Sequence, residues 1–119
     1  KGTSAEQLVG CFYNGLTALS AELEGRHYGG GVLELVPSEI EKLVLPLPTK
    51  GHIDLRELDR QIRSPMSAQD VLEANSRVVL GGLGLSRAKQ DCILHGWVRL
   101  RNRRHRTTSE EKVEASEAA

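Results

Sequence analysis

Apolar residues recur at helical spacing through the first part of the chain. One stripe of them follows intervals of three and four residues: Leu8, Phe12, Leu16, Leu19 and Leu23. This spacing predicts a helical region over residues 4–24. Asn14 and Gly15 lie in the middle of it and both weaken a helix, so we expect two consecutive helices with a break there. Ser4 can cap the first helix, and Gly25 can end the second.

The pattern changes to that of short strands after residue 25. Three glycines lead into residues 32–36, an apolar run that Pro37 bounds. Ser38 and Glu41 have the spacing of a capping box for a short helix. Residues 44–47 form a second apolar run, which an internal proline limits to an edge strand or an extended segment. We therefore expect a strand–helix–strand unit within residues 31–48.

Helical signals dominate the rest of the chain. Capping boxes predict two helices, one beginning after Asp54 and one after Ser67. A glycine-rich turn follows, and Ser86 can then cap a final helix that ends near His105. Because the predicted strands are few and short, the predicted fold class is α+β and mostly α, with a helical carboxy-terminal extension.

The final predicted helix carries apolar and basic residues on different sides. At about 100° per residue, Ile93, Trp97 and Leu100 share one side. The basic side is formed by Arg99, Arg103 and Arg106. Arg104 would lie on the apolar side, so we expect the packed part of this helix to end near Leu100. Beyond that point the helix would project outward, which suits a surface that meets a polyanion.

Composition adds a charge segregation that the totals hide. The 119 residues carry 16 basic and 16 acidic side chains, so the formal net charge is zero. Residues 99–106 nevertheless hold one cluster of arginines: Arg99, Arg101, Arg103, Arg104 and Arg106. An acidic segment over residues 109–119 follows it. The cluster is denser than the helix dipole requires, and arginine suits forked phosphate contacts, so nucleic-acid contact and a solvated helix end both stay open.

Several other kinds of chemistry have no support in the sequence. No apolar run is long enough to span a membrane, and the polar amino end does not resemble a signal peptide. The four histidines have no cysteine or carboxylate at ligand spacing, so we expect no metal site. Cys11 and Cys92 fit reduced core residues, which favours a cytoplasmic location. The three consecutive glycines fit neither a P-loop nor a dinucleotide fingerprint; they indicate either a tight entry into the strand or a close backbone approach to nucleic acid.

One stretch of the chain resembles a known family. NGLTALSAELEGRHYGGGVLELVPSEIEKLVLPLP, residues 14–48, resembles the end of the specificity region in adenine-N6 DNA methyltransferases of the TaqI type and in the fused restriction-modification enzymes related to them. The shared features are an AEL-x-G-R-like helix end, a Y-G-G-G-x-L-x-L strand, a P-S-E-like helix start and an L-P-x-P strand. Type I restriction specificity subunits close their recognition domains with a looser form of this pattern. The resemblance covers about a third of the chain.

The resemblance implies methyl transfer from S-adenosylmethionine to adenine in duplex DNA. The catalytic Asn-Pro-Pro-Tyr or Asn-Pro-Pro-Phe motif and the glycine-containing cofactor motif of these enzymes do not occur in this sequence. The target base would have to be flipped into a pocket of a separate catalytic domain. We therefore expect the chain to be the noncatalytic carboxy-terminal part of such an enzyme, with S-adenosylmethionine bound in the catalytic domain and no cofactor in this chain.

The resemblance also implies a set of site residues. Arg26 and His27 are expected to contact DNA phosphates, and Tyr28 is expected to support the backbone. The motif scaffold is completed by Gly29, Gly30 and Gly31. The arginines of residues 99–106 join the DNA-binding set on charge alone.

These inferences lead to one domain model and two hypotheses. Residues 1–106 would form the carboxy-terminal domain, in which residues 1–48 close the target-recognition region and residues 49–106 form a helical extension. Residues 107–119 would be a flexible acidic tail. The leading hypothesis is duplex-DNA binding beside the catalytic methyltransferase domain. The alternative is an interaction module whose helices after Gly51 dock on that domain or on a sister subunit without contacting DNA.

Overall fold

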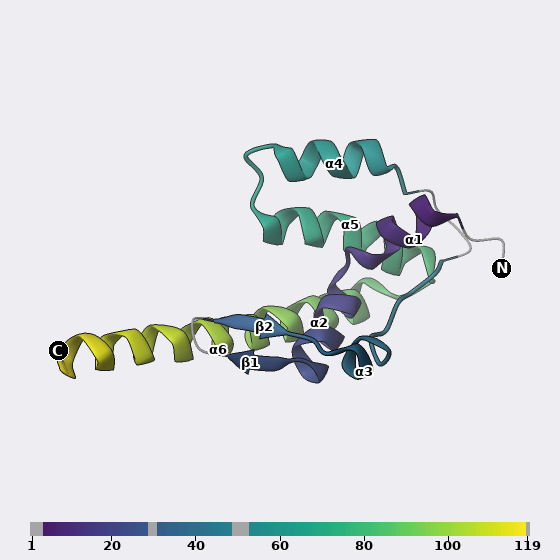
Figure 1. Cartoon of the computed structure of the whole chain (residues 1–119). Coiled ribbons are helices and arrows are strands. Elements are labelled where there is room, and N and C mark those ends of the chain that lie inside the picture. The colour runs from purple at the N-terminus through teal and green to yellow at the C-terminus, as the bar shows by residue number, and fades with distance from the viewer. Residues whose placement is uncertain (1–3, 29–30, 49–52, 119) are drawn as a thin grey trace.

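The computed structural model describes residues 4–28, 31–48 and 53–118 (Figure 1). The described residues form six helices and a two-stranded sheet, so the predicted α+β, mostly α class is confirmed. The elements in chain order are α1 (Ala5–Phe12), α2 (Gly15–Glu24), β1 (Arg26–Tyr28), β2 (Val32–Glu34), α3 (Pro37–Ile40), α4 (Leu55–Arg63), α5 (Ala68–Gly82) and α6 (Arg87–Ala118). Among the described residues, no helix is long and apolar enough to cross a membrane.

The predicted break between the first two helices is present, and a side chain of α5 donates hydrogen bonds to its backbone carbonyl groups. Asn14 caps α2 by accepting a hydrogen bond from the Thr17 amide at 3.0 Å. The Asn75 side chain of α5 donates to the carbonyl oxygens of Gly10 at 2.9 Å and of Tyr13 at 2.6 Å. These bonds satisfy carbonyl groups that the interrupted helix leaves without an intrahelical partner. The break is therefore fixed by α5 and is not a loose joint.

The core lies around α5, which packs against α2, α4 and α6. Its apolar members come from α1, α4, α5 and α6: Cys11, Leu58, Val71, Leu72, Val79, Leu80 and Leu94. Asp54 and Ser67 cap α4 and α5 as predicted, because their side chains accept from backbone amides of the first turn. The capping signals therefore located both helices correctly.

The predicted strand–helix–strand unit is present only in its first two elements, and its strand has a partner that was not predicted. β2 pairs antiparallel with β1, which comes just before it in the chain, and His27 lies opposite Leu33. Residues 44–47, where we expected an edge strand or an extended segment, form no strand. The backbone of Val44 is instead held by α2: the Thr17 hydroxyl donates to its carbonyl at 2.7 Å, and the Ser20 hydroxyl accepts from its amide at 3.1 Å. These side chains occupy the backbone groups that a strand partner would otherwise bind.

The start of α3 also differs from its prediction. Ser38 lies inside the helix and does not cap it, because Val36 is the capping residue and Pro37 the first helical one. The Glu39 carboxylate accepts from the Val36 amide at 3.2 Å. Proline has no amide hydrogen to satisfy and its fixed φ suits a first helical turn, which moves the helix start one residue ahead of the serine.

The last helix is longer than expected. We predicted an end near His105, but α6 continues to Ala118 and extends away from the other elements (Figure 1). Residues 109–118 are rich in glutamate and alanine, which favour helix, and this outweighs their lack of apolar residues. The backbone therefore shows no helix end at the predicted boundary after residue 106. The flexibility of this tail stays a prediction.

Candidate nucleic-acid interface

Two arginines of α6 lie exposed, one helical turn apart. Arg99 and Arg103 are four residues apart on a regular helix, so both side chains leave the same side of α6. Among the described side chains of the predicted arginine cluster, this pair is exposed, whereas those of Arg101 and Arg104 are half-buried.

Arg104 has a different role, because it holds α6 against α2 and the hairpin. Its Nη2 lies 2.7 Å from Glu22 Oε1, and its Nε is 3.2 Å from each oxygen of the same carboxylate. Its Nη1 also donates to the Gly31 carbonyl. The Glu22 side chain is 2% exposed and the Arg104 side chain 13% exposed. The predicted end of helix packing near Leu100 is therefore wrong, because an ion pair continues the contact by one turn.

Arg101 bridges α6 to the beginning of α5. Its guanidinium carbon lies 4.8 Å from the centre of the Trp97 ring, a cation–π contact within the helix. Its Nη2 donates to Gln69 Oε1 at 2.7 Å. The residue is half-buried. Arg101 and Arg104 therefore both make contacts that stabilise the fold, although the DNA contacts predicted for them stay predictions.

The two predicted phosphate ligands of β1 are exposed and lie beside acidic groups. Arg26 Nε donates to Glu39 Oε1 at 2.8 Å, and the Arg26 side chain is 60% exposed. This guanidinium, helped by the Val36 amide, holds the pKa of the Glu39 carboxyl below its usual 4.5. His27 Nε2 lies 3.5 Å from Glu22 Oε2. The hairpin and α6 thus meet at Glu22, which the sequence analysis did not connect with either of them.

Some predicted site residues fall outside what the structure describes. Gly29 and Gly30 lie outside the described residues, and so do the side chains of Tyr28 and Arg106. Gly31 is described and has a positive φ of 74°, a conformation that favours glycine. Its carbonyl accepts the hydrogen bond from Arg104 described above, so this glycine has a defined structural role.

A groove between α2 and α6 lies beside the exposed arginine pair. It has a volume of about 290 Å³, and its lining consists of Leu19, Gly96, Arg99, Leu100 and Arg103. The two leucines are half-buried, whereas the two arginines are exposed. The groove therefore combines an apolar lining with two cationic groups. The sequence analysis found the arginines and missed the groove, because Leu19 comes from a helix that is remote in sequence.

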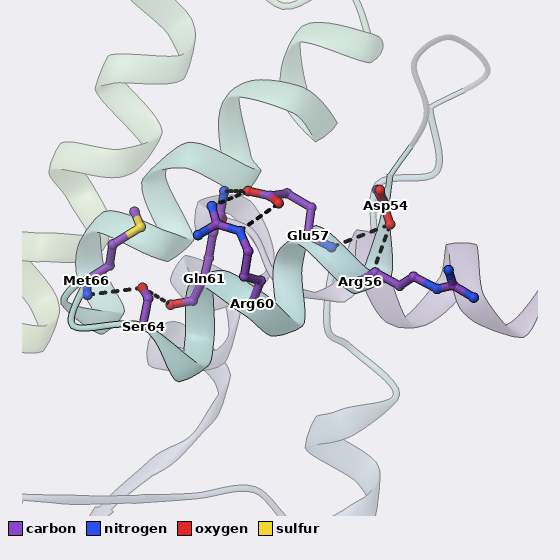
Figure 2. A network of polar contacts seen from close by, with 7 residues as sticks. All are labelled: Asp54, Arg56, Glu57, Arg60, Gln61, Ser64 and Met66. Atoms are coloured by element: carbon purple, nitrogen blue, oxygen red, sulfur yellow. Dashed lines mark hydrogen bonds and ion pairs between the residues drawn. The ribbon is translucent and has the colours of Figure 1, made fainter.

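The basic residues of α4 form a contrasting surface. Arg60 Nη2 lies 2.6 Å from Glu57 Oε1, and Arg63 Nε lies 2.9 Å from Asp59 Oδ1. Figure 2 shows Arg60 and Gln61 both directed to the Glu57 carboxylate. Each ion pair raises the pKa of its arginine, chiefly through the hydrogen bond to the carboxylate. This helix is therefore locally neutralised, and it supplies matched controls for the arginines of α6.

The described residues contain no group of three or more His, Cys, Asp or Glu side chains that could hold a metal ion. Cys11 is buried, and this burial raises the pKa of its thiol, whereas Cys92 is exposed. Within the described residues, the arginine pair with its groove is the feature most suited to binding an anionic ligand.

Comparison with known proteins gives one match. Residues 1–80 match the family model described as type II methyltransferase M.Eco57I, C-terminal domain. The match takes in α1 to α4 and most of α5, whereas α6 follows it in the chain. No curated protein and no solved structure matches the chain.

Proposed function

We propose a function from the premise that the chain belongs to the family of the C-terminal domain of the type II methyltransferase M.Eco57I. In this proposal it contributes duplex-DNA binding to an S-adenosylmethionine-dependent adenine methyltransferase. The predicted place in a restriction-modification methyltransferase is confirmed by this membership. The chain has neither the catalytic Asn-Pro-Pro motif nor the glycine-containing cofactor motif. The proposed role is therefore to hold the DNA while a catalytic domain carries out the methyl transfer.

The observation that supports this role is the exposed pair Arg99 and Arg103. Each guanidinium can donate two parallel hydrogen bonds to one phosphate, a geometry that lysine cannot reproduce. The pair lies on a long rigid helix, and Arg104 fixes that helix against α2. A fixed pair loses less conformational entropy on binding than two mobile side chains on a loop would lose.

A salt titration of duplex binding tests the proposal. Fluorescence anisotropy of a labelled duplex is measured with the chain at several salt concentrations. Each phosphate contact contributes a slope of about −0.9 to the logarithm of affinity against the logarithm of salt concentration. Arg99→Ala combined with Arg103→Ala is therefore expected to lower the magnitude of that slope by about 2 and the affinity at low salt by at least about tenfold.

The matched control removes two arginines from α4. Arg56→Ala combined with Arg60→Ala has the same four-residue spacing and lowers the net charge equally. If binding depended on total charge alone, this control would reduce affinity as strongly as the α6 substitutions do. Equal losses in the two double variants, or no duplex binding by the unchanged protein at low salt, would refute the proposed role of α6.

A second candidate function is docking on another part of the enzyme, and α1 favours it. This helix packs inward through the buried Gly10 and Cys11, while Leu8, Val9 and Phe12 are 44%, 60% and 51% exposed. An added Cβ at Gly10 would lie 2.5 Å from Ile53 Cγ2, so close packing requires a small residue there. Large apolar residues thus face outward, which is typical of an interaction surface.

We therefore propose the surface of α1 as a docking face, in addition to the helices after Gly51. Co-expression of this chain with a tagged catalytic domain of the methyltransferase measures the docking. Leu8→Ser combined with Phe12→Ser is expected to lower the recovery of the chain with that domain and to leave the duplex affinity of the chain unchanged. Unchanged recovery would refute docking through α1.

A further inference from the structure

We propose that the groove between α2 and α6 seats one sugar–phosphate unit of a DNA strand. In this arrangement Leu19, Gly96 and Leu100 contact the deoxyribose, and Arg99 and Arg103 bind the phosphates on either side of it. The inference rests on the proposed DNA-binding function. It goes further by assigning a specific site and by stating that this site contacts the backbone of one strand and not the base edges.

The chemistry of the lining matches that of the ligand. A deoxyribose presents carbon–hydrogen groups between two anionic phosphates, so it has an apolar centre and negatively charged ends. The groove has both kinds of group in its lining, because half-buried Leu19 and Leu100 line it together with the exposed residues Arg99 and Arg103. Contacts of this kind position a protein on DNA and carry no sequence information directly.

The dimensions of the groove agree with a single unit. Arg99 and Arg103 are separated by about 6 Å along the helix axis, from a rise of about 1.5 Å per residue. This separation is comparable to that of successive phosphates along one strand. The groove volume is about 290 Å³, which is at or below the lower limit of about 300–1,000 Å³ for sites that enclose a whole small molecule. It therefore suits a sugar with its phosphates better than a complete nucleotide with its base.

Gly96 is not required by the packing of α6 on α2. It lies within α6, where glycine weakens a helix relative to alanine. An added Cβ would lie 3.7 Å from Leu19 Cδ1 and Cδ2, an ordinary van der Waals contact, so packing alone does not require glycine. The residue does line the groove, and a side chain larger than that of alanine would fill part of it. A glycine at this position keeps the space beside Leu19 open.

An acidic peptide is the main competing ligand, since carboxylates also bind arginine pairs. DNA is favoured because the family is that of a type II methyltransferase domain and because the apolar lining lies next to both arginines. The two ligands can be separated by competition. A synthetic oligoglutamate of the same total charge should displace a labelled duplex much less effectively than an unlabelled duplex does.

The experiment combines two groove variants with methyl NMR of the unchanged full chain. Gly96→Leu fills the groove without changing charge, whereas Gly96→Ala is the control that adds one methyl at ordinary contact distance. We expect duplex affinity to fall at least about tenfold in Gly96→Leu and to stay within about twofold in Gly96→Ala. On titration with a short duplex, the methyl signals of Leu19 and Leu100 should shift, whereas those of Leu8 and Leu83 should not.

The outcomes separate this proposal from the function on which it rests. If Gly96→Leu folds and binds like the unchanged protein while the Arg99 and Arg103 double variant loses affinity, the groove proposal is overturned and DNA binding by α6 stands. If the double variant also binds normally, the proposed function itself fails. Unshifted Leu19 and Leu100 signals under saturating duplex overturn the groove proposal even where Gly96→Leu does not fold. Equal displacement by oligoglutamate also overturns it, because the site would then accept any polyanion.

Discussion

Replacing Arg104 should strongly destabilise the domain, because this residue pairs with a buried carboxylate. Arg104→Met keeps most of the length of the side chain and removes its charge. Glu22, whose side chain is 2% exposed, would then lose its ion-pair partner, and the Gly31 carbonyl would lose a donor. Removing one partner of a buried ion pair typically costs about 3–5 kcal/mol. We expect about 3 kcal/mol, at the lower end, because the Arg104 side chain is 13% exposed.

This loss is large relative to the stability of a small domain, which is about 5–15 kcal/mol. Urea unfolding followed by circular dichroism measures it. With an m-value of about 1.5 kcal/mol per molar urea, the midpoint should fall by about 2 M.

A second substitution identifies the physical cause. Glu22→Gln in the Arg104→Met background removes the buried charge, so it should restore at least half of the lost stability. Arg60→Met is the matched control, because its side chain and that of Glu57 are 65% and 48% exposed. Since exposed ion pairs contribute little to stability, it should leave the urea midpoint nearly unchanged. The reasoning is refuted if Arg104→Met is as stable as the unchanged protein, or if Glu22→Gln restores nothing.

Two further predictions concern packing and pH. Gly15→Ala should cost about 1–3 kcal/mol in urea unfolding, because its Cβ would lie 2.7 Å from Leu94 Cδ2. Gly81→Ala is the control, because its Cβ would lie 3.8 Å from the nearest atom, Gln90 Nε2. It should be neutral or stabilising by up to about 1 kcal/mol. Equal changes in unfolding free energy for Gly15→Ala and Gly81→Ala would contradict the packing argument. NMR titration should show the Glu39 carboxyl titrating below 4.5 and returning upward in Arg26→Ala. Because the folded-state pKa of Glu39 is lowered, its stabilisation is present above pH 4.5 and is lost as the pH falls through the folded value. The difference in unfolding free energy between the unchanged protein and Arg26→Ala should therefore be smaller at pH 3 than at neutral pH. A difference that does not change with pH would contradict the assignment of the lowered Glu39 pKa to Arg26.

Features encoded locally could be predicted from the sequence. Asn14 and Gly15 located the break between α1 and α2, and the capping residues Asp54 and Ser67 located α4 and α5. Each of these signals acts through backbone groups within one helical turn. The sequence left an edge strand and an extended segment open at residues 44–47, because the choice between them depended on distant side chains. The hydroxyl groups that hold this segment lie on α2, and no local pattern indicates that pairing.

The candidate site likewise has features that could be predicted from the sequence and features that could not. A cluster of arginines is visible in the sequence, but which of them lie exposed depends on partners far along the chain. Glu22 and Arg104 are separated by 82 positions, so no spacing rule connects them. One signal was available: an arginine on the apolar side of a helix requires a buried acidic partner. The sequence analysis used that position to end the helix packing, whereas the fold places an ion pair there.

The pairing of Glu22 with Arg104 also has a consequence for the order in which the protein folds during synthesis. At about 5–20 residues per second, the 82 positions between the two residues correspond to about 4–16 seconds of translation. During that interval α2 has been made, but α6, against which it packs, has not. Residues 1–80, which carry the family match, therefore complete their burial only when the last helix leaves the ribosome. The final third of the chain thus sets the time at which the whole domain becomes native.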